Sequence, residues 1–168
     1  MIVVADSSPL RYLILIEQIH LLPALFGSVV IPPAVVRELT HPSAPLQVHA
    51  WMAKVPEWVT VQSPSMQLQG APAILGYGET EAIALAQELG ADALLADDEH
   101  ARQESLRRNI PVQGTLGILN LAAEHGLLSD LSSAFSRLRK TNFRVSERLL
   151  EYFLELDARR NARQRRPK

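Results

Sequence analysis

The feature that most constrains the fold of this chain is the alternation of short apolar segments, rich in β-branched residues, with helical segments. The apolar segments are about four residues long and apolar throughout, as in strands that are covered on both faces. They predict strands at 2–5, 28–31, 58–61, 93–96 and 111–112. Strands alternating with helices indicate a parallel sheet with helices on both faces and right-handed crossovers.

Helices are expected between these strands and after the last one. The clearest is 79–89, which is introduced by Gly76-Tyr77-Gly78 and ended by Gly90. The pattern predicts the others at 10–19, 21–26, 34–39, 47–54, 100–108, 115–125, 130–139 and from 147 onward. The polar stretch 63–72 contains proline and is expected to be a loop.

Composition narrows the class of protein. A chain of 168 residues with 47% apolar residues is long enough for one domain with a real core. The absence of cysteine excludes a disulfide scaffold, a thiolate zinc site and a thiol nucleophile. No apolar run reaches the ~18 residues of a membrane span, and the N-terminus shows no signal-peptide pattern. We therefore expect a soluble, cytoplasmic protein that does not interact with membranes.

The charge is unevenly distributed along the chain. The last ten residues carry six basic residues and no acidic one, whereas residues 1–158 carry 11 basic and 18 acidic residues, a formal charge of −7. We expect a globular domain at 1–155 and a basic C-terminal tail at 156–168. The acidic body argues against passive phosphate binding by the fold itself.

Carboxylates follow the predicted strands at several points. Asp6 comes directly after the first strand, and Asp97 and Asp98 come directly after the strand 93–96. Glu38 lies on the helix after the second strand, and Glu79 begins the helix before the strand 93–96. Ligands of parallel sheets bind beyond the carboxyl ends of the strands, so these acids are expected at one edge of the sheet.

Such a cluster has to be neutralised by protons or cations, and a hard divalent cation is the natural partner of carboxylates. Two like charges ~4 Å apart repel by on the order of 4 kcal/mol at an effective dielectric of ~20. Carboxylates and water are the ligands that Mg²⁺ and Mn²⁺ prefer, and such a site can hydrolyse a phosphodiester. Any one of these acids could instead cap a helix, but independent caps need not converge.

Four stretches, taken together and in order, resemble the PIN-domain family. They are VVADSSPL (3–10), IPPAVVREL (31–39), GYGETEAIALAQELGADALLADD (76–98) and GTLGIL (114–119). The resemblance extends from residue 1 to about residue 155 and is strongest to prokaryotic PIN proteins related to the toxins of VapBC toxin–antitoxin pairs. It implies a three-layer α/β/α sandwich with a central parallel sheet, and a Mg²⁺- or Mn²⁺-dependent ribonuclease that is usually dimeric.

The resemblance also implies roles for individual residues. The expected catalytic residues are Asp6, Glu38, Glu79 and Asp98, and the expected metal ligands are Asp6, Glu79, Asp98 and Asp97. Ser8 matches a small hydroxyl residue that supports the site.

Two of these assignments are open. Glu79 stands where the family usually has Asp, and Glu81 is the other candidate for this acid. Residues two apart on a helix point to different sides, so only one of them is expected to face the other acids. Glu79 is favoured because it lies nearer the strand ends. Asp97 and Asp98 compete because Ala96-Asp97 stands where the family carries Thr-Arg.

The implied substrate is single-stranded or looped RNA, whose bases and backbone are accessible. Arg11 and Arg102 are expected to bind it, and Arg107, Arg108 and the tail are further candidates. The implied protein partners are a second copy of the chain and an antitoxin.

Two alternatives belong to other classes of protein. A small-substrate metal-dependent phosphatase of the HAD type needs D-x-D after the first strand, where this chain has Asp6-Ser7-Ser8. A non-catalytic PIN-like assembly module, or one silenced by an antitoxin, is disfavoured because all four acidic positions are retained.

Overall fold

The computed structural model describes residues 1–164, except for the side chain of Gln164. The chain divides into two compact units, Met1–Thr115 and Leu116–Lys168. Of the predicted basic tail, residues 156–164 belong to the last helix, and residues 165–168 lie outside the described residues.

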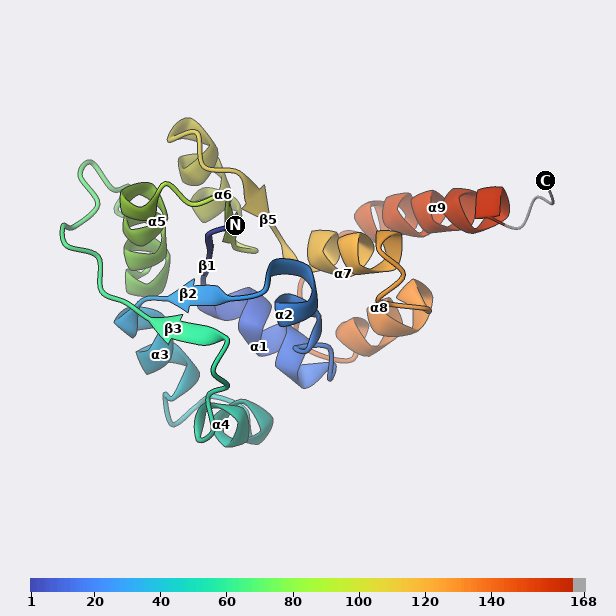
Figure 1. Cartoon of the computed structure of the whole chain (residues 1–168), viewed down its shortest axis with the longest axis horizontal. Coiled ribbons are helices and arrows are strands. Elements are labelled where there is room, and N and C mark those ends of the chain that lie inside the picture. The colour runs from blue at the N-terminus through green and yellow to red at the C-terminus, as the bar shows by residue number, and fades with distance from the viewer. Residues whose placement is uncertain (165–168) are drawn as a thin grey trace. The chain divides into compact units, whose positions relative to one another are not determined.

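The first unit contains a five-stranded sheet in the order β3-β2-β1-β4-β5, with every neighbouring pair parallel (Figure 1). Its strands are β1 (Val3–Ala5), β2 (Val29–Ile31), β3 (Val59–Val61), β4 (Ala93–Leu95) and β5 (Val112–Gln113). In the central register, Val4 lies opposite Val30 on one side and Leu94 on the other. The predicted parallel α/β fold is confirmed.

Helices cover both faces of this sheet. They are α1 (Ser7–Leu15), α2 (Leu21–Phe26), α3 (Pro33–Leu39), α4 (Leu46–Met52), α5 (Tyr77–Leu89) and α6 (Glu99–Arg107). The chain moves one way across the sheet from β1 to β3 and the other way from β4 to β5, so right-handed crossovers place α1 and α4 on one face and α5 and α6 on the other. In the view of Figure 1, α5 and α6 lie above strands β2 and β3, and α1 and α4 lie below them.

The position of α3 matters most for the site. This helix starts directly after β2 and packs against both α1 and α5. The core around it is apolar and fully buried, including Val4, Leu13, Ile83 and Leu94. As a result, the N-terminal ends of α1 and α5 and the body of α3 are held close together.

Two helices start at least two residues earlier than the sequence predicts. Helix α1 begins at Ser7 rather than at residue 10, because Pro9 is tolerated in a first turn, where the backbone N–H has no helical partner. Helix α5 begins at Tyr77 rather than at Glu79, with Gly76 as its N-cap. Both shifts move residues of the candidate site into regular helix.

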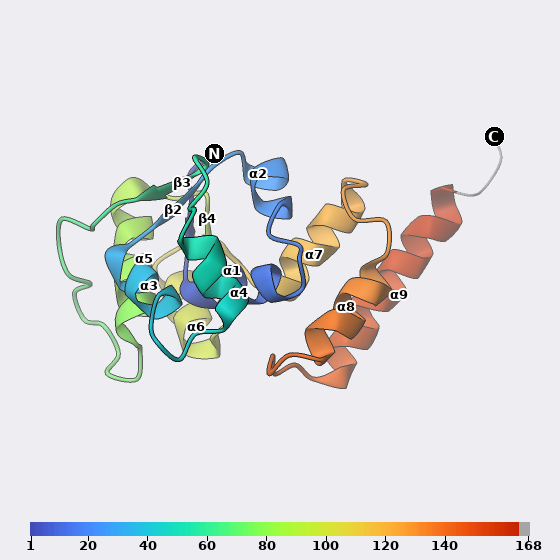
Figure 2. The ribbon, with the colours of Figure 1, turned by 90° about the horizontal axis from the view of Figure 1, so that it is seen from below.

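The second unit is helical. Its elements are α7 (Thr115–Glu124), which starts at the last residue of the first unit, α8 (Leu131–Arg139) and α9 (Glu147–Gln164) (Figure 2). Helices α8 and α9 pack together, with the rings of Phe135 and Phe153 edge to face at 6.4 Å.

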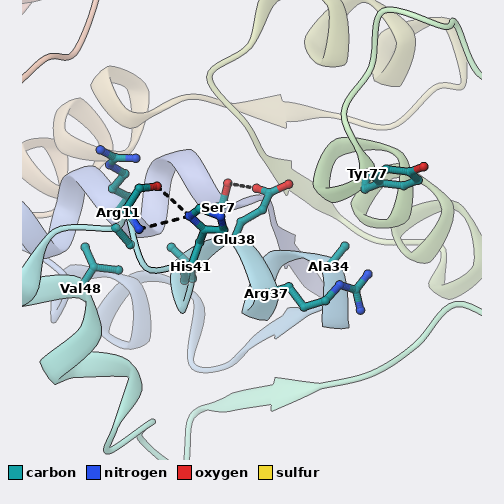
Figure 3. Close-up of a pocket in the computed structure, with 11 residues that line it drawn as sticks. Ser7, Arg11, Ala34, Arg37, Glu38, His41, Val48 and Tyr77 are labelled. Atoms are coloured by element: carbon teal, nitrogen blue, oxygen red, sulfur yellow. Dashed lines mark hydrogen bonds between the residues drawn. The ribbon is translucent and has the colours of Figure 1, made fainter.

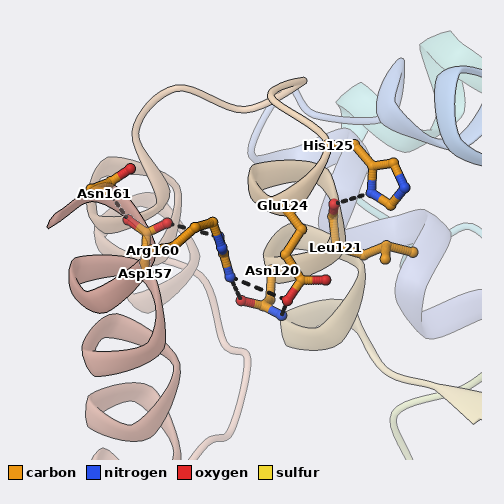
Figure 4. A network of polar contacts seen from close by, with 7 residues as sticks. All are labelled: Asn120, Leu121, Glu124, His125, Asp157, Arg160 and Asn161. Atoms are coloured by element: carbon orange, nitrogen blue, oxygen red, sulfur yellow. Dashed lines mark hydrogen bonds and ion pairs between the residues drawn. The ribbon is translucent and has the colours of Figure 1, made fainter. Parts of the chain in front are cut away.

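Arg160 joins α9 to α7 (Figure 4). Its guanidinium donates to Asn120 at 2.8 Å, and it also pairs with Glu124 at 3.3 Å and Asp157 at 2.9 Å. Among the described helices of both units, none combines the length and the apolar character that a membrane crossing needs.

Candidate active site

The candidate site lies where the order of the strands reverses. The sheet runs outward in both directions from the neighbouring strands β1 and β4, and ligands of such sheets bind at this switch point, beyond the carboxyl ends. Asp6 directly follows β1, and its backbone N–H donates to the carbonyl of Leu95 in β4 at 2.9 Å. Asp97 follows β4 two residues later.

Asp6 is the most buried acid of this group, at 4% exposure. Burial raises its pKa to about 7, the charges of Glu38, Glu79 and Asp97 add to the effect, and the backbone N–H of Ser7 opposes it. Asp6 occupies the N-cap position of α1, yet its side chain makes no capping hydrogen bond. Its buried Oδ1 has no hydrogen-bond partner among the described residues. A role as a simple helix cap therefore does not explain this carboxylate.

Glu38 accepts hydrogen bonds from two helices, and Figure 3 shows the one from Ser7. The Ser7 hydroxyl, at the start of α1, donates to its Oε2 at 2.5 Å, and the Gly78 amide, at the start of α5, donates to its Oε1 at 3.0 Å. A Cβ at Gly78 would stand 2.7 Å from Cδ of Glu38, so only glycine allows this approach. The hydroxyl that contacts an acid is thus that of Ser7, one residue before the predicted Ser8.

Glu79 is the third residue of α5, inside its first turn. Its Oε2 accepts a hydrogen bond from the Gly76 amide at 2.7 Å, which is one half of a capping box, because Gly76 has no side chain to make the reciprocal bond. Burial raises the pKa of Glu79, and the charges of Asp98 and Glu38 add to this, while the Gly76 amide and His100 oppose it. Glu79 therefore caps its helix and also lies within the electrostatic reach of two other acids.

Glu81 serves the neighbouring helix. Its Oε2 accepts from the backbone N–H of Ala34 at 2.8 Å, which satisfies a free donor in the first turn of α3. Its Oε1 pairs with Arg37 on the same helix at 3.4 Å. The structure thus separates the two candidates: Glu79 lies among the acids, and Glu81 supports the helix that carries Glu38.

Asp97 and Asp98 have different neighbours. Both oxygens of Asp97 accept hydrogen bonds from Thr115, from its backbone N–H at 2.7 Å and its hydroxyl at 2.6 Å. Burial raises the pKa of Asp97, against the opposing effects of Thr115 and Arg102, and its charge raises the pKa of Asp6. Asp98 caps α6 by accepting a hydrogen bond from the Ala101 amide at 3.0 Å, and its charge raises the pKa of Glu79 instead. Asp97 is therefore the partner of Asp6, and Asp98 that of Glu79.

The predicted RNA-binding arginines differ in their surroundings. Arg102 donates to the carbonyl of Ala96 at 3.3 Å and lowers the pKa of Asp97, so its positive charge partly offsets the negative charge of the acids. Arg107 and Arg108 both pair with the buried Glu104, at 2.8 and 2.7 Å. Arg11 lines an open cavity together with Glu38.

Ser7, Gly78 and Thr115 belong to the site and were not predicted. Thr115 stands in the GTLGIL stretch and Gly78 directly precedes Glu79. Both lie in stretches that resemble the PIN-domain family, but the resemblance assigns neither residue a role. Choosing Ser7 over Ser8 required the true start of α1, which the sequence pattern places three residues too late.

The described residues contain no group of three Asp, Glu, His or Cys side chains arranged to hold a metal ion. A divalent cation nevertheless fits the chemistry of the acids. The buried Asp6 oxygen has no hydrogen-bond donor within residues 1–164, and three further carboxylates raise the pKa of Asp6. Oxygen ligands of this kind suit Mg²⁺ and Mn²⁺.

Comparison with known proteins adds two findings. A family model, DUF3368, described as a PIN domain, matches residues 2–158. The structure is similar to that of a PilT N-terminus domain protein from the hyperthermophilic archaeon Sulfolobus solfataricus P2, with a TM-score of 0.55 and 20% sequence identity. The similarity covers 74% of this chain and 96% of that chain, and at this identity it concerns the fold alone. No curated protein sequence matches this chain.

Proposed function

Because this chain belongs to the PIN-domain family, which generally includes metal-dependent nucleases, we propose that it is a Mg²⁺- or Mn²⁺-dependent endoribonuclease. The observation that carries the proposal is the buried carboxylate of Asp6, which lies at the switch point of the sheet with one oxygen free of hydrogen bonds among the described residues. The three neighbouring acids whose charges raise its pKa come from separate segments of the chain.

The residues have distinct roles in this proposal. Asp6 and Asp97, with Glu79 and Asp98 beside them, would hold the cation. When bound there, a divalent cation activates water and stabilises the charge that develops on the phosphodiester. The Thr115 hydrogen bonds keep the Asp97 carboxylate in one orientation.

Glu38 is proposed to accept a proton from the attacking water. Glu38 is an exposed residue, and donors at both oxygens hold its carboxylate in a single orientation. A fixed base that faces solvent suits proton transfer from water. Ser7 and Gly78 would then act as positioning residues for Glu38.

The test is hydrolysis of single-stranded RNA by the full chain. We expect cleavage with Mg²⁺ or Mn²⁺, loss of cleavage with EDTA, and recovery when the cation is restored. Asp6→Asn should lower the activity at least ~100-fold, since loss of a metal ligand or its support costs 10–100-fold or more. Cleavage that survives exhaustive chelation would contradict the metal-dependent mechanism.

We also propose that the protein is the toxin of a toxin–antitoxin pair, or a close relative, that acts as a homodimer. The support is the resemblance of residues 1–155 to the VapC branch of the family. Expression should arrest growth, and co-expression of a small DNA-binding protein encoded directly upstream should relieve the arrest. Light scattering of the purified chain checks the dimer, and unimpaired growth would argue against the toxin role.

A further inference from the structure

An open cavity of about 480 Å³ adjoins the acids (Figure 3). Its volume lies in the range of roughly 300–1,000 Å³ that is typical of small-ligand sites. Ser7 and Glu38 form part of its wall, so the cavity opens directly beside the acidic site. Three other lining residues carry groups that recognise a nucleotide: Arg11, Arg37 and Tyr77.

Tyr77 is unusually exposed for an aromatic residue in a folded unit. Its side chain is 86% exposed, although it is the first residue of a 13-residue helix. The backbone on both sides is held by acids of the site, since the Gly76 amide donates to Glu79 and the Gly78 amide donates to Glu38. The ring therefore projects from a fixed point of the backbone and contributes little to the packing of the unit.

The cations lie on the other elements that line the cavity. Arg11 comes from α1, and its Nε is buried without a hydrogen-bond partner among the described residues. Arg37 comes from α3, with its side chain 65% exposed and a 3.4 Å contact to Glu81. Figure 3 shows Arg11 on one side of Glu38 and Tyr77 on the other, with Arg37 between Glu38 and Tyr77 in this view.

We propose that this cavity is a subsite for one nucleotide of single-stranded RNA, next to the phosphodiester that is cleaved. The base stacks on the ring of Tyr77, Arg37 binds the phosphate on that side of Glu38, and Arg11 binds a phosphate on the other side of Glu38. This inference rests on the proposed nuclease function and deepens it.

The chemistry of the subsite determines its selectivity. Every base has a π-face, so stacking on an aromatic ring tolerates any sequence. In a duplex the bases are already stacked and paired, and the ring cannot reach them. The subsite therefore selects unpaired RNA without reading the identity of the base at this position.

The first experiment scans an abasic nucleotide along a single-stranded RNA oligonucleotide that the protein cleaves. At one position next to the cleaved bond, removal of the base should lower kcat/KM by about 5- to 160-fold, the range expected for one stacked base. Tyr77→Ala should cause a similar loss on the intact oligonucleotide and no further loss on the abasic one. Tyr77→Phe keeps the ring and should retain the activity.

The matched control is Ile74→Ala. Ile74 is also exposed, at 64%, and stands three residues before Tyr77, but it does not line the cavity. Its removal should leave the sensitivity to the abasic position unchanged. Circular dichroism of each variant establishes that the fold is retained.

The second experiment addresses the phosphate. Binding of the same oligonucleotide is measured in EDTA at several salt concentrations, by anisotropy of a 5′ fluorescein. For Arg11→Gln, the slope of log K against log salt should fall by about 0.7, the value for one phosphate contact on a single strand.

The outcomes separate the two proposals. If the protein cleaves RNA but Tyr77→Ala responds to the abasic position as the wild type does, the subsite is wrong and the nuclease function stands. An unchanged salt slope for Arg11→Gln contradicts the phosphate contact. If the protein neither binds nor cleaves any RNA, both proposals fail.

Discussion

Neutralising Asp6 should change how the stability of the protein depends on pH. The pKa of this carboxyl rises from an ordinary 3.8 to about 7 in the folded protein, chiefly because it is buried. Between these values the folded state keeps a proton that the unfolded state has released. The stabilising effect is therefore complete below about pH 4 and is lost as the pH rises through about 7.

The magnitude follows from the same two pKa values. At 1.36 kcal/mol per pH unit, the full loss of unfolding free energy corresponds to about 4 kcal/mol, and the part that falls between pH 5 and pH 8 is about 2–3 kcal/mol. Asp6→Asn cannot ionise, so this contribution disappears. Measured in EDTA, the free energy of unfolding of the variant minus that of the wild type should increase by about 2–3 kcal/mol as the pH is raised from 5 to 8.

The assay is urea unfolding at a series of pH values, followed by circular dichroism. The exposed Glu57→Gln variant controls for the loss of one negative charge. Adding Mg²⁺ at pH 8 should stabilise the wild type more than Asp6→Asn, because a ligand stabilises the state that binds it. Parallel pH profiles for the wild type and Asp6→Asn would refute the reasoning, since the burial of Asp6 would then carry no electrostatic cost.

Two further predictions concern residues around Glu38. Gly78→Ala should lower kcat/KM at least ~10-fold, because the added methyl group would collide with the Glu38 carboxylate. Steady-state kinetics together with a melting curve checks this, and wild-type activity would contradict it. Glu79→Gln should abolish most activity and weaken Mn²⁺ binding in calorimetry. Glu81→Gln should change activity less than about threefold. It should lower the free energy of unfolding by roughly 1 kcal/mol, since it loses a charged contact to the start of α3. A weaker Mn²⁺ site in Glu81→Gln than in Glu79→Gln would reverse the assignment.

The order of the strands and helices could be predicted from the sequence alone. Apolar strands and amphipathic helices are local patterns, and most predicted boundaries lie within two or three residues of those in the structure. The rule for parallel sheets then placed Asp6 and Asp97 at one edge, because carboxyl ends of parallel strands share an edge. Fold class and the region of the site therefore follow from local patterns and topology.

The tertiary structure decided which residue of each neighbouring pair faces the site. Ser7 rather than Ser8 contacts Glu38, because the direction of a helical side chain depends on where the helix begins. Glu81 bonds to Ala34, 47 residues away in the chain, and Gly78 bonds to Glu38, 40 residues away. Contacts over such separations depend on how α3 packs against α5, which no local pattern encodes.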